Sequence, residues 1–467
     1  MMNAPDLDFQ ASWDRIVERR NLERDLAVLL KKGGDYGDIF IGREENTRVV
    51  MVNGEITEWG EQSHSGAGFR VINGGCTGFA SSHDLSPQSM NECADAASAH
   101  VGRPPRAVKL RNAGRLWPST AKSERLDPLI RHMRMSCDRA MLAEQSVRQV
   151  VCQADIHMRF KIIANSAGVY FSDRSTVRDL HVYVTIEKSN STFTGHRFGS
   201  STDQLSDLAK DAARMAVEQV DARDIKQGSL PVVLGPGWCG MVMHEAVGHA
   251  LEADFVLKGE SVFSGRMNDQ IASELVTIVD DATMRRGRAS CRCDDEGTQS
   301  KPLVLVEKGV LKNFMSDRWT ALLGGTSSTG HGRRAGFDAP PLPRMTNTFL
   351  MPGQDDPTDI IRSVQKGVYV ASIGKGAVNI HSGDFSFWIE RGYLIEDGRL
   401  GRPIKNTYLT GHGPSVLRNI DRVGSDSAVE FGAGTCFKEG QIVPVSVGQP
   451  TVRIRELLLN SPNEIPI

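Results

Sequence analysis

Short apolar runs that end at Asn-Gly or Gly-Gly recur along this chain, and they limit it to a turn-rich fold with many strands. Between residues 38 and 82, Asn53-Gly54 follows the runs DIFIG and TRVVMV, and Gly74-Gly75 follows the run GAGFRVI. Such residue pairs are typical of tight antiparallel hairpins. The runs HMRFKIIA, GVYFSD and DLHVYVTIE between residues 150 and 194 have the same character. We therefore expect antiparallel strands in both segments.

Helical patterns alternate with these strands in the first half of the chain. Apolar and charged residues repeat at helical spacing over residues 12–32, and the pattern stops at Gly33-Gly34, a common helix end. The same periodicity predicts helices over residues 86–100, 126–147 and 203–220. The N-terminal part is therefore predicted to mix helices with antiparallel strands.

The second half is predicted to be richer in strands. A polar segment near residue 225 precedes an apolar strand over residues 230–234, and we place a boundary there, which gives domains 1–225 and 226–467. After one helix over residues 237–257, runs such as LVLVEKG, GVYVASIG and VPVSVG predict strands, with short helices chiefly at 316–323 and 358–364. The predicted fold class is α+β with a β-rich C-terminal domain.

Charge and composition argue against several classes of function. The 467 residues include 55 Lys and Arg against 57 Asp and Glu, so the chain has no positive excess for binding nucleic acid. No stretch reaches about 18 consecutive apolar residues, and the N-terminal segment lacks the pattern of an export signal. The eight cysteines are scattered rather than spaced as a disulfide framework. These features predict a cytoplasmic protein without nucleic-acid or membrane partners.

The strongest local motif is HEAVGH, which places His244, Glu245 and His249 together. It is one residue longer than the H-E-x-x-H helix, in which two imidazoles hold a metal and the carboxylate handles a proton of water. In a regular α-helix, residues five apart lie about 140° apart around the axis, so the two rings would not face one ion. A single π-type turn would return them to one face, and Gly248 would permit that distortion.

A divalent metal at this motif needs at least one more protein ligand. Glu252, Asp254 or a distant Cys or His could supply it, and spacing alone does not choose among them.

The segment GPGWCG over residues 235–240 also fits the G-x-G-x-x-G pattern of a dinucleotide site. No βαβ repeat surrounds it, so we interpret these glycines as a tight strand-to-helix turn with Trp238 in the core.

Further motifs occur along the chain in the same order as in a known family. They are GAGFRV (66–71) and GFASS (78–82) upstream, and DDEGT (294–298), SSTGHGRR (327–334), PRMTNT (343–348), GDFSFWIERGYLIEDG (383–398) and GTCFKEGQIVPVSVGQP (434–450) downstream. With the H-E-A-x-G-H helix, they resemble the TldD/PmbA (modulator of DNA gyrase) metallopeptidases over nearly the whole chain. Because the metal-binding set is retained, the chain resembles the catalytic subunit rather than the inactive PmbA/TldE-like partner.

This resemblance implies a metal site and a chemistry. In TldD-like proteins two helix histidines and a C-terminal cysteine hold one metal, which here are His244, His249 and Cys436, and Glu245 becomes the general base. A His2Cys set suits zinc best and also accepts iron. Phe437 stands where the family usually has glycine after the metal cysteine, a departure that bears on substrate range.

The resemblance also implies a substrate and a partner. An unfolded or extended peptide would pair with the strand around residues 384–390, and two subunits would enclose a cavity, with the N-terminal domain contributing to both dimer and cavity. The second subunit is either an identical chain or a PmbA/TldE-like one. Two alternatives stay open: an amide hydrolase acting on a small peptide-like metabolite, and a non-catalytic binding subunit with a structural metal. The candidate substrate-binding residues are His331, Arg333, Arg334, Arg344, His381 and Asp384.

Overall fold

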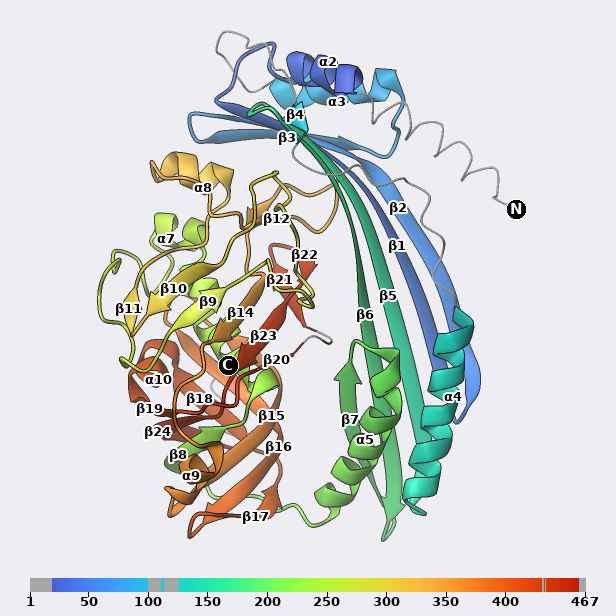
Figure 1. Cartoon of the computed structure of the whole chain (residues 1–467), viewed down its shortest axis with the longest axis vertical. Helices are drawn as coiled ribbons and strands as arrows, with labels where there is room; N and C mark the ends of the chain where they lie inside the picture. The colour runs from blue at the N-terminus through green and yellow to red at the C-terminus, as the bar shows by residue number, and fades with distance from the viewer. Residues whose placement is uncertain (1–18, 100–110, 113–125, 431, 433, 462–467) are drawn as a thin grey trace.

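Very long antiparallel strands build the N-terminal half of the computed structural model, which describes residues 19–99, 111–112, 126–430, 432 and 434–461 (Figure 1). They form one seven-stranded sheet in the order β3-β2-β1-β5-β6-β4, with β7 paired to β6. The strands are β1 (Tyr36–Val52), β2 (Glu55–Asn73), β3 (Cys76–Ser82), β4 (Arg111–Asn112), β5 (Val147–Asn165), β6 (Val169–Lys188) and β7 (Ser191–Gly199).

Because successive side chains of a strand point to opposite faces, the two faces of this sheet pack against different parts of the molecule. Ile39 and Ile41 of β1 belong to a core shared with the helices, whereas Phe40 between them packs with Phe337 from the C-terminal half. The helices are α2 (Arg19–Leu29), α3 (Pro87–Ser98), α4 (Leu126–Ala143) and α5 (Leu205–Val220). The C-terminal half lies on the concave side of the curved sheet (Figure 1).

The C-terminal half is built mainly from two further sheets. One has the order β15-β8-β24-β18-β16-β17, and an additional pairing of β15 with β16 closes it on itself. The other has the order β11-β10-β9-β14-β23-β20. The first contains β8 (Gly228–Leu234), β15 (Lys366–Val378), β16 (Asp384–Glu396), β17 (Arg399–Ile404), β18 (Tyr408–His412), β19 (Ile420–Val423), which pairs with β24, and β24 (Val452–Asn460). The second contains β9 (Ile278–Asp280), β10 (Leu303–Glu307), β11 (Val310–Leu311), β14 (Asn347–Leu350), β20 (Ala428–Glu430) and β23 (Ser446–Gln449).

Two small hairpins and several short helices complete this half. The hairpins are β12 (Gly332–Arg333) with β13 (Leu342–Pro343), and β21 (Thr435–Lys438) with β22 (Gln441–Pro444). The helices are α6 (Met241–Met243), α7 (Ala253–Lys258), α8 (Arg318–Leu323), α9 (Pro357–Arg362) and α10 (Gly413–Asn419). Among the described residues, every helix is too short or too polar to span a lipid bilayer.

The α+β class with a β-rich C-terminal region is confirmed. The turns at Asn53-Gly54 and Gly74-Gly75 connect β1 to β2 and β2 to β3, as predicted. The strands run much longer than the predicted runs, because polar stretches between them also pair across the sheet. Residues 12–18 of the predicted first helix lie outside the described residues. The boundary near residue 225 stays a prediction; that residue lies in the connection from α5 to β8.

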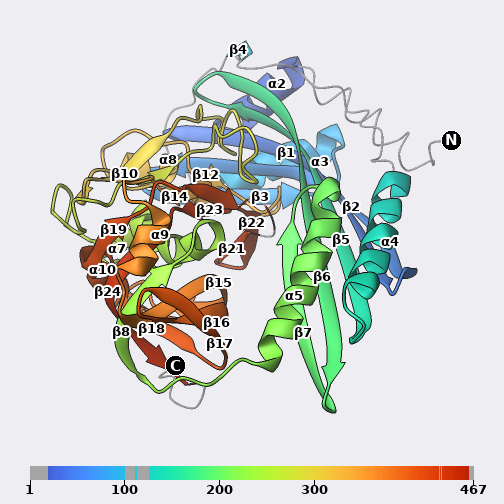
Figure 2. The ribbon, with the colours of Figure 1, turned by 60° about the horizontal axis from the view of Figure 1, so that its bottom comes forward.

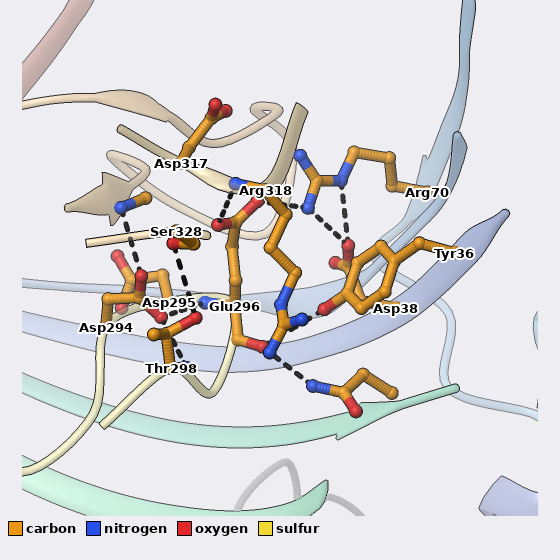
Figure 3. Close-up of polar contacts among 12 residues, drawn as sticks. Tyr36, Asp38, Arg70, Asp294, Asp295, Glu296, Thr298, Asp317, Arg318 and Ser328 are labelled. Carbon is orange, nitrogen blue, oxygen red and sulfur yellow. Dashed lines mark hydrogen bonds and ion pairs between the residues drawn. The ribbon is translucent and has the colours of Figure 1, made fainter. Parts of the chain in front are cut away.

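A buried ionic network joins the two halves (Figure 3). Arg70 of β2 donates from Nε to Asp38 Oδ2 at 2.7 Å and also pairs with Glu296 of the DDEGT loop. Arg334 Nη2 binds the other oxygen of Asp38 at 2.8 Å. The backbone carbonyl of Glu296 accepts from the Tyr36 hydroxyl at 3.1 Å. The DDEGT and SSTGHGRR loops therefore tie the C-terminal half to the long sheet.

Candidate metal centre

The segment after β8 is a broken helix, not the continuous helix predicted over residues 237–257. It runs through a tight turn at Gly237–Gly240, one turn of α6, a π-helical turn at His244–Gly248 and a tight turn at His249–Leu251. Glu252 is extended, with φ −79° and ψ 127°, and α7 begins after it. The break at Glu252 turns its carboxylate back towards His249.

The π-helical turn confirms the distortion that the six-residue motif requires. Its last residue, Gly248, has an ordinary helical φ of −58°, so glycine is not needed here for backbone freedom. The requirement is steric: a Cβ at Gly248 would collide with the sulfur of Met345. Gly248 is therefore required for close packing against Met345, and not for backbone freedom as predicted.

The turn brings His244 and His249 to Cys436 on strand β21. One ligand atom from each of the three residues lies within 4.8 Å of the others, and all three side chains are buried. The Cys436 Sγ lies 3.4 Å from His249 Nε2. His244 is 2% exposed, yet neither ring nitrogen has a hydrogen-bond partner among the described residues. Buried polar atoms are normally satisfied, so this donor set fits a divalent cation.

The two acidic alternatives for a third ligand are engaged elsewhere. The Nζ of Lys438 donates to Glu252 Oε2 at 2.9 Å and to Asp254 Oδ1 at 2.8 Å. Glu252 Oε2 also lies 3.2 Å from His249 Nδ1. The carboxylate therefore orients the imidazole from behind, a support that is common for metal-bound histidines.

These contacts shift the ionisation of the cluster. Burial would raise the pKa of the Cys436 thiol, but His249 and His244 hold that pKa well below its usual range. Burial would likewise raise the pKa of Glu252, but Lys438 and His249 lower it to about 2. A thiolate is the form that binds a metal. Burial would lower the pKa of His249, but Glu252 and Cys436 raise it well above its usual range, so the thiolate faces an imidazolium whose proton a metal would displace.

Glu245 lies next to His249 in this cluster. Its side chain is 26% exposed, and its Oε2 is 3.7 Å from His249 Nε2. The carboxylate of Glu245 therefore reaches both the cluster and solvent. Phe437, next to Cys436 on the strand, points to the opposite face of the hairpin and is 68% exposed.

The predicted substrate-binding residues lie in several places. His331 is buried, with Nε2 3.1 Å from Asp280 Oδ1. Arg344 is buried against the backbone of the Cys436 hairpin. His381 and Asp384 are exposed near the start of β16, where Asp384 is paired with His412 of β18. In the described residues, only Arg333 and Arg334 of the six line a cavity that the long sheet and the C-terminal half enclose together.

That cavity has a volume of about 270 Å³ and lies between the two halves. The long sheet contributes Arg159 and Lys161 of β5, and the C-terminal half contributes Arg333 and Ile442. Thr435 precedes Cys436 on β21, and Val443 pairs with Cys436 from β22. Both residues also line this cavity. The β21–β22 hairpin lies on the side of the C-terminal half that faces the long strands in both views (Figures 1 and 2).

Sequence reasoning missed the supporting roles of Glu252 and Lys438. Both carried a usable signal. Glu252 lies three residues after His249, within reach of a ring nitrogen. Lys438 lies two residues after Cys436 and therefore on the same face of an extended strand.

Comparisons with known proteins agree with these motifs. Family models described as PmbA/TldA metallopeptidase domain 1, central domain and C-terminal domain match residues 37–100, 125–220 and 227–461. The chain is 34% identical over 466 residues to a metalloprotease TldD homolog of Haemophilus influenzae, covering 93% of this chain and 95% of that one. It is 30% identical over 298 residues to a zinc metalloprotease TldD homolog of Saccharolobus solfataricus, covering 64% and 66%. The crystal structure of TldE from Thermococcus kodakarensis is 19% identical and superposes with a TM-score of 0.76, covering 94% of this chain and 100% of that one.

Proposed function

The chain belongs to the PmbA/TldD metallopeptidase family, and from this premise we propose that it is a metal-dependent peptidase with its active site at His244, Glu245, His249 and Cys436. One observation carries the proposal: the buried, unpartnered ring nitrogens of His244 lie beside the His249 and Cys436 ligand atoms. A cation bound there would take one ring nitrogen of His244 together with the His249 and Cys436 ligand atoms.

We propose zinc as the metal, because His2Cys sites suit zinc and a relative is named a zinc metalloprotease. A zinc ion bound here would polarise the scissile carbonyl and acidify a water molecule. His244, His249 and the Cys436 thiolate would hold it. Glu252 keeps Nδ1 of His249 engaged, so that Nε2 is the nitrogen that faces the site.

Glu245 is proposed as the general base. Its carboxylate takes up a proton from the attacking water and returns it to the departing amine. The partial exposure of Glu245 allows contact with a bound substrate, whereas the buried ligands do not offer a carboxylate for this step. The proposed substrate is a peptide in an extended conformation, bound so that its scissile carbonyl reaches the metal and Glu245.

The decisive experiment is Glu245→Gln in the zinc-loaded chain, with hydrolysis of an unstructured peptide followed by mass spectrometry. We expect about one zinc per chain and a loss of hydrolysis of about 10²- to 10⁴-fold. Glu260→Gln, at an exposed glutamate in the same region, is the matched control and should keep full activity. Full activity of Glu245→Gln would refute the assigned mechanism.

The same assay separates the two alternatives and tests assembly. Cleavage of small peptide-like amides without cleavage of longer peptides would favour a biosynthetic amide hydrolase. Zinc binding without cleavage, alone or with a PmbA/TldE-like subunit added, would favour a binding subunit. We propose that the second subunit is a copy of this chain or a protein of the same fold, which light scattering of the purified chain would distinguish.

A further inference from the structure

The hairpin that carries Cys436 is held by buried cations instead of by a sheet. Among the described strands, β21 and β22 pair only with each other. Their turn is tight, with positive φ values of 47° at Glu439 and 76° at Gly440. An isolated two-stranded hairpin is marginally stable in water. The position of the Cys436 sulfur therefore depends on side chains from outside the hairpin.

Arg344 provides the contact that spans both strands. Its Nη2 donates to the carbonyl oxygen of Cys436 itself at 2.5 Å, and its Nη1 donates to the carbonyl oxygen of Gln441 at 3.4 Å. The side chain is fully buried. Arg333 acts at the far end of β22, where its Nη2 donates to the carbonyl oxygen of Pro444 at 2.7 Å.

Neither arginine forms an ion pair with a carboxylate in the described part of the chain, unlike Arg70 and Arg334 in the buried network. Burying a guanidinium is costly unless it is paired or hydrogen-bonded. Nε of Arg344 has no hydrogen-bond partner among the described residues, so the two bonds to hairpin carbonyls supply this compensation. The planar guanidinium suits two carbonyl groups on neighbouring strands, which the single ammonium of lysine does not. Arg344 is thus built to fix the geometry of this hairpin.

We propose that Arg344 is a positioning residue that holds the Cys436 sulfur at the place a metal requires, 3.4 Å from His249 Nε2. This inference rests on the proposed metal site and assigns Arg344 a role different from the substrate contact predicted from sequence. Because the side chain is buried, it acts on the metal only through the hairpin backbone.

The test compares Arg344→Met and Arg344→Lys with Arg334→Met in the full chain. Zinc affinity is measured by competition with a chelating indicator, and unfolding of the zinc-free protein is measured in parallel. Arg334 is as deeply buried as Arg344 but binds Asp38 instead of the hairpin, so it is a matched control. We expect both Arg344 variants to lose about 10- to 100-fold in zinc affinity. The Arg334 variant should keep its affinity even where its unfolding temperature falls.

Cobalt(II) bound in place of zinc reports on the metal–sulfur contact independently of affinity. It is applied to Arg344→Lys, which retains the positive charge. The sulfur-to-cobalt absorption band should be present in the wild type and weakened in Arg344→Lys. A folded Arg344 variant with wild-type zinc affinity and an unchanged cobalt band would overturn the inference. Failure of the wild type to bind zinc would instead refute the proposed function, so the two failures are distinguishable.

Discussion

The molecule buries polar groups in two regions that treat charge in opposite ways. In the network between the halves, Arg70 pairs with both Asp38 and Glu296 (Figure 3). Arg334 also pairs with Asp38. At the candidate metal centre, both ring nitrogens of His244 stay without a partner among the described residues. The first region pairs its charges with opposite charges and joins the two halves, although Nε and Nη1 of Arg334 have no hydrogen-bond partner among the described residues. The second leaves donors open, which is what a binding site for a cation requires.

The largest expected effect comes from breaking the internal network. Arg70→Met leaves Glu296 buried without its cation, and we expect a loss of about 3–5 kcal/mol in the free energy of unfolding. Urea denaturation measures it. Zinc affinity should stay unchanged, because none of the contacts of Arg70 reaches the hairpin or the histidines. A coupled loss of zinc binding would show that the two regions are not independent.

The metal centre should respond to its ligand instead. At a free zinc concentration of about 100 times Kd, zinc should stabilise the wild type by about 2.7 kcal/mol. The same increment should appear in Arg70→Met and vanish in His244→Ala, because only the latter loses a ligand. Thermal unfolding with and without zinc tests this. An equal increment in His244→Ala would argue against His244 as a ligand.

The network should also respond to pH through Asp317. Burial, with Glu296 nearby, raises the pKa of Asp317 to about 7, so the folded state keeps a proton that the unfolded state releases near pH 4. Stability therefore falls as pH rises from about 4 to 7. In Asp317→Asn the slope should flatten by up to about 1.4 kcal/mol per pH unit. Urea denaturation at several pH values measures the slope, and an unchanged slope would contradict the assignment.

The smallest effect is expected where charges are not buried at all. Arg362 and Asp359 form an ion pair 3.1 Å apart on α9, with side chains 69% and 65% exposed. Arg362→Met should lose only about 0.3–0.5 kcal/mol in the free energy of unfolding. Urea denaturation measures this loss. A loss near that of Arg70→Met would mean that burial does not explain the difference between the regions.

Much of the local structure was predictable from residue patterns. The turns at Asn53-Gly54 and Gly74-Gly75 and the helices α4 and α5 follow from patterns within a few residues. The π-helical turn at His244–Gly248 followed from the spacing of the two histidines. The extended conformation of Glu252 did not, because it depends on pairing with Lys438, which is 186 residues away in sequence.

The α+β class and the motif that places His244, Glu245 and His249 within one turn depend on neighbouring residues and can be read from the amino-acid order. The partners of that turn depend on the tertiary fold. It brought Cys436 to His249 across 187 residues, paired Glu252 with Lys438, and placed Arg344 on the hairpin backbone. Such contacts arise when distant segments are buried together and their polar groups must find partners, a condition that local spacing does not encode.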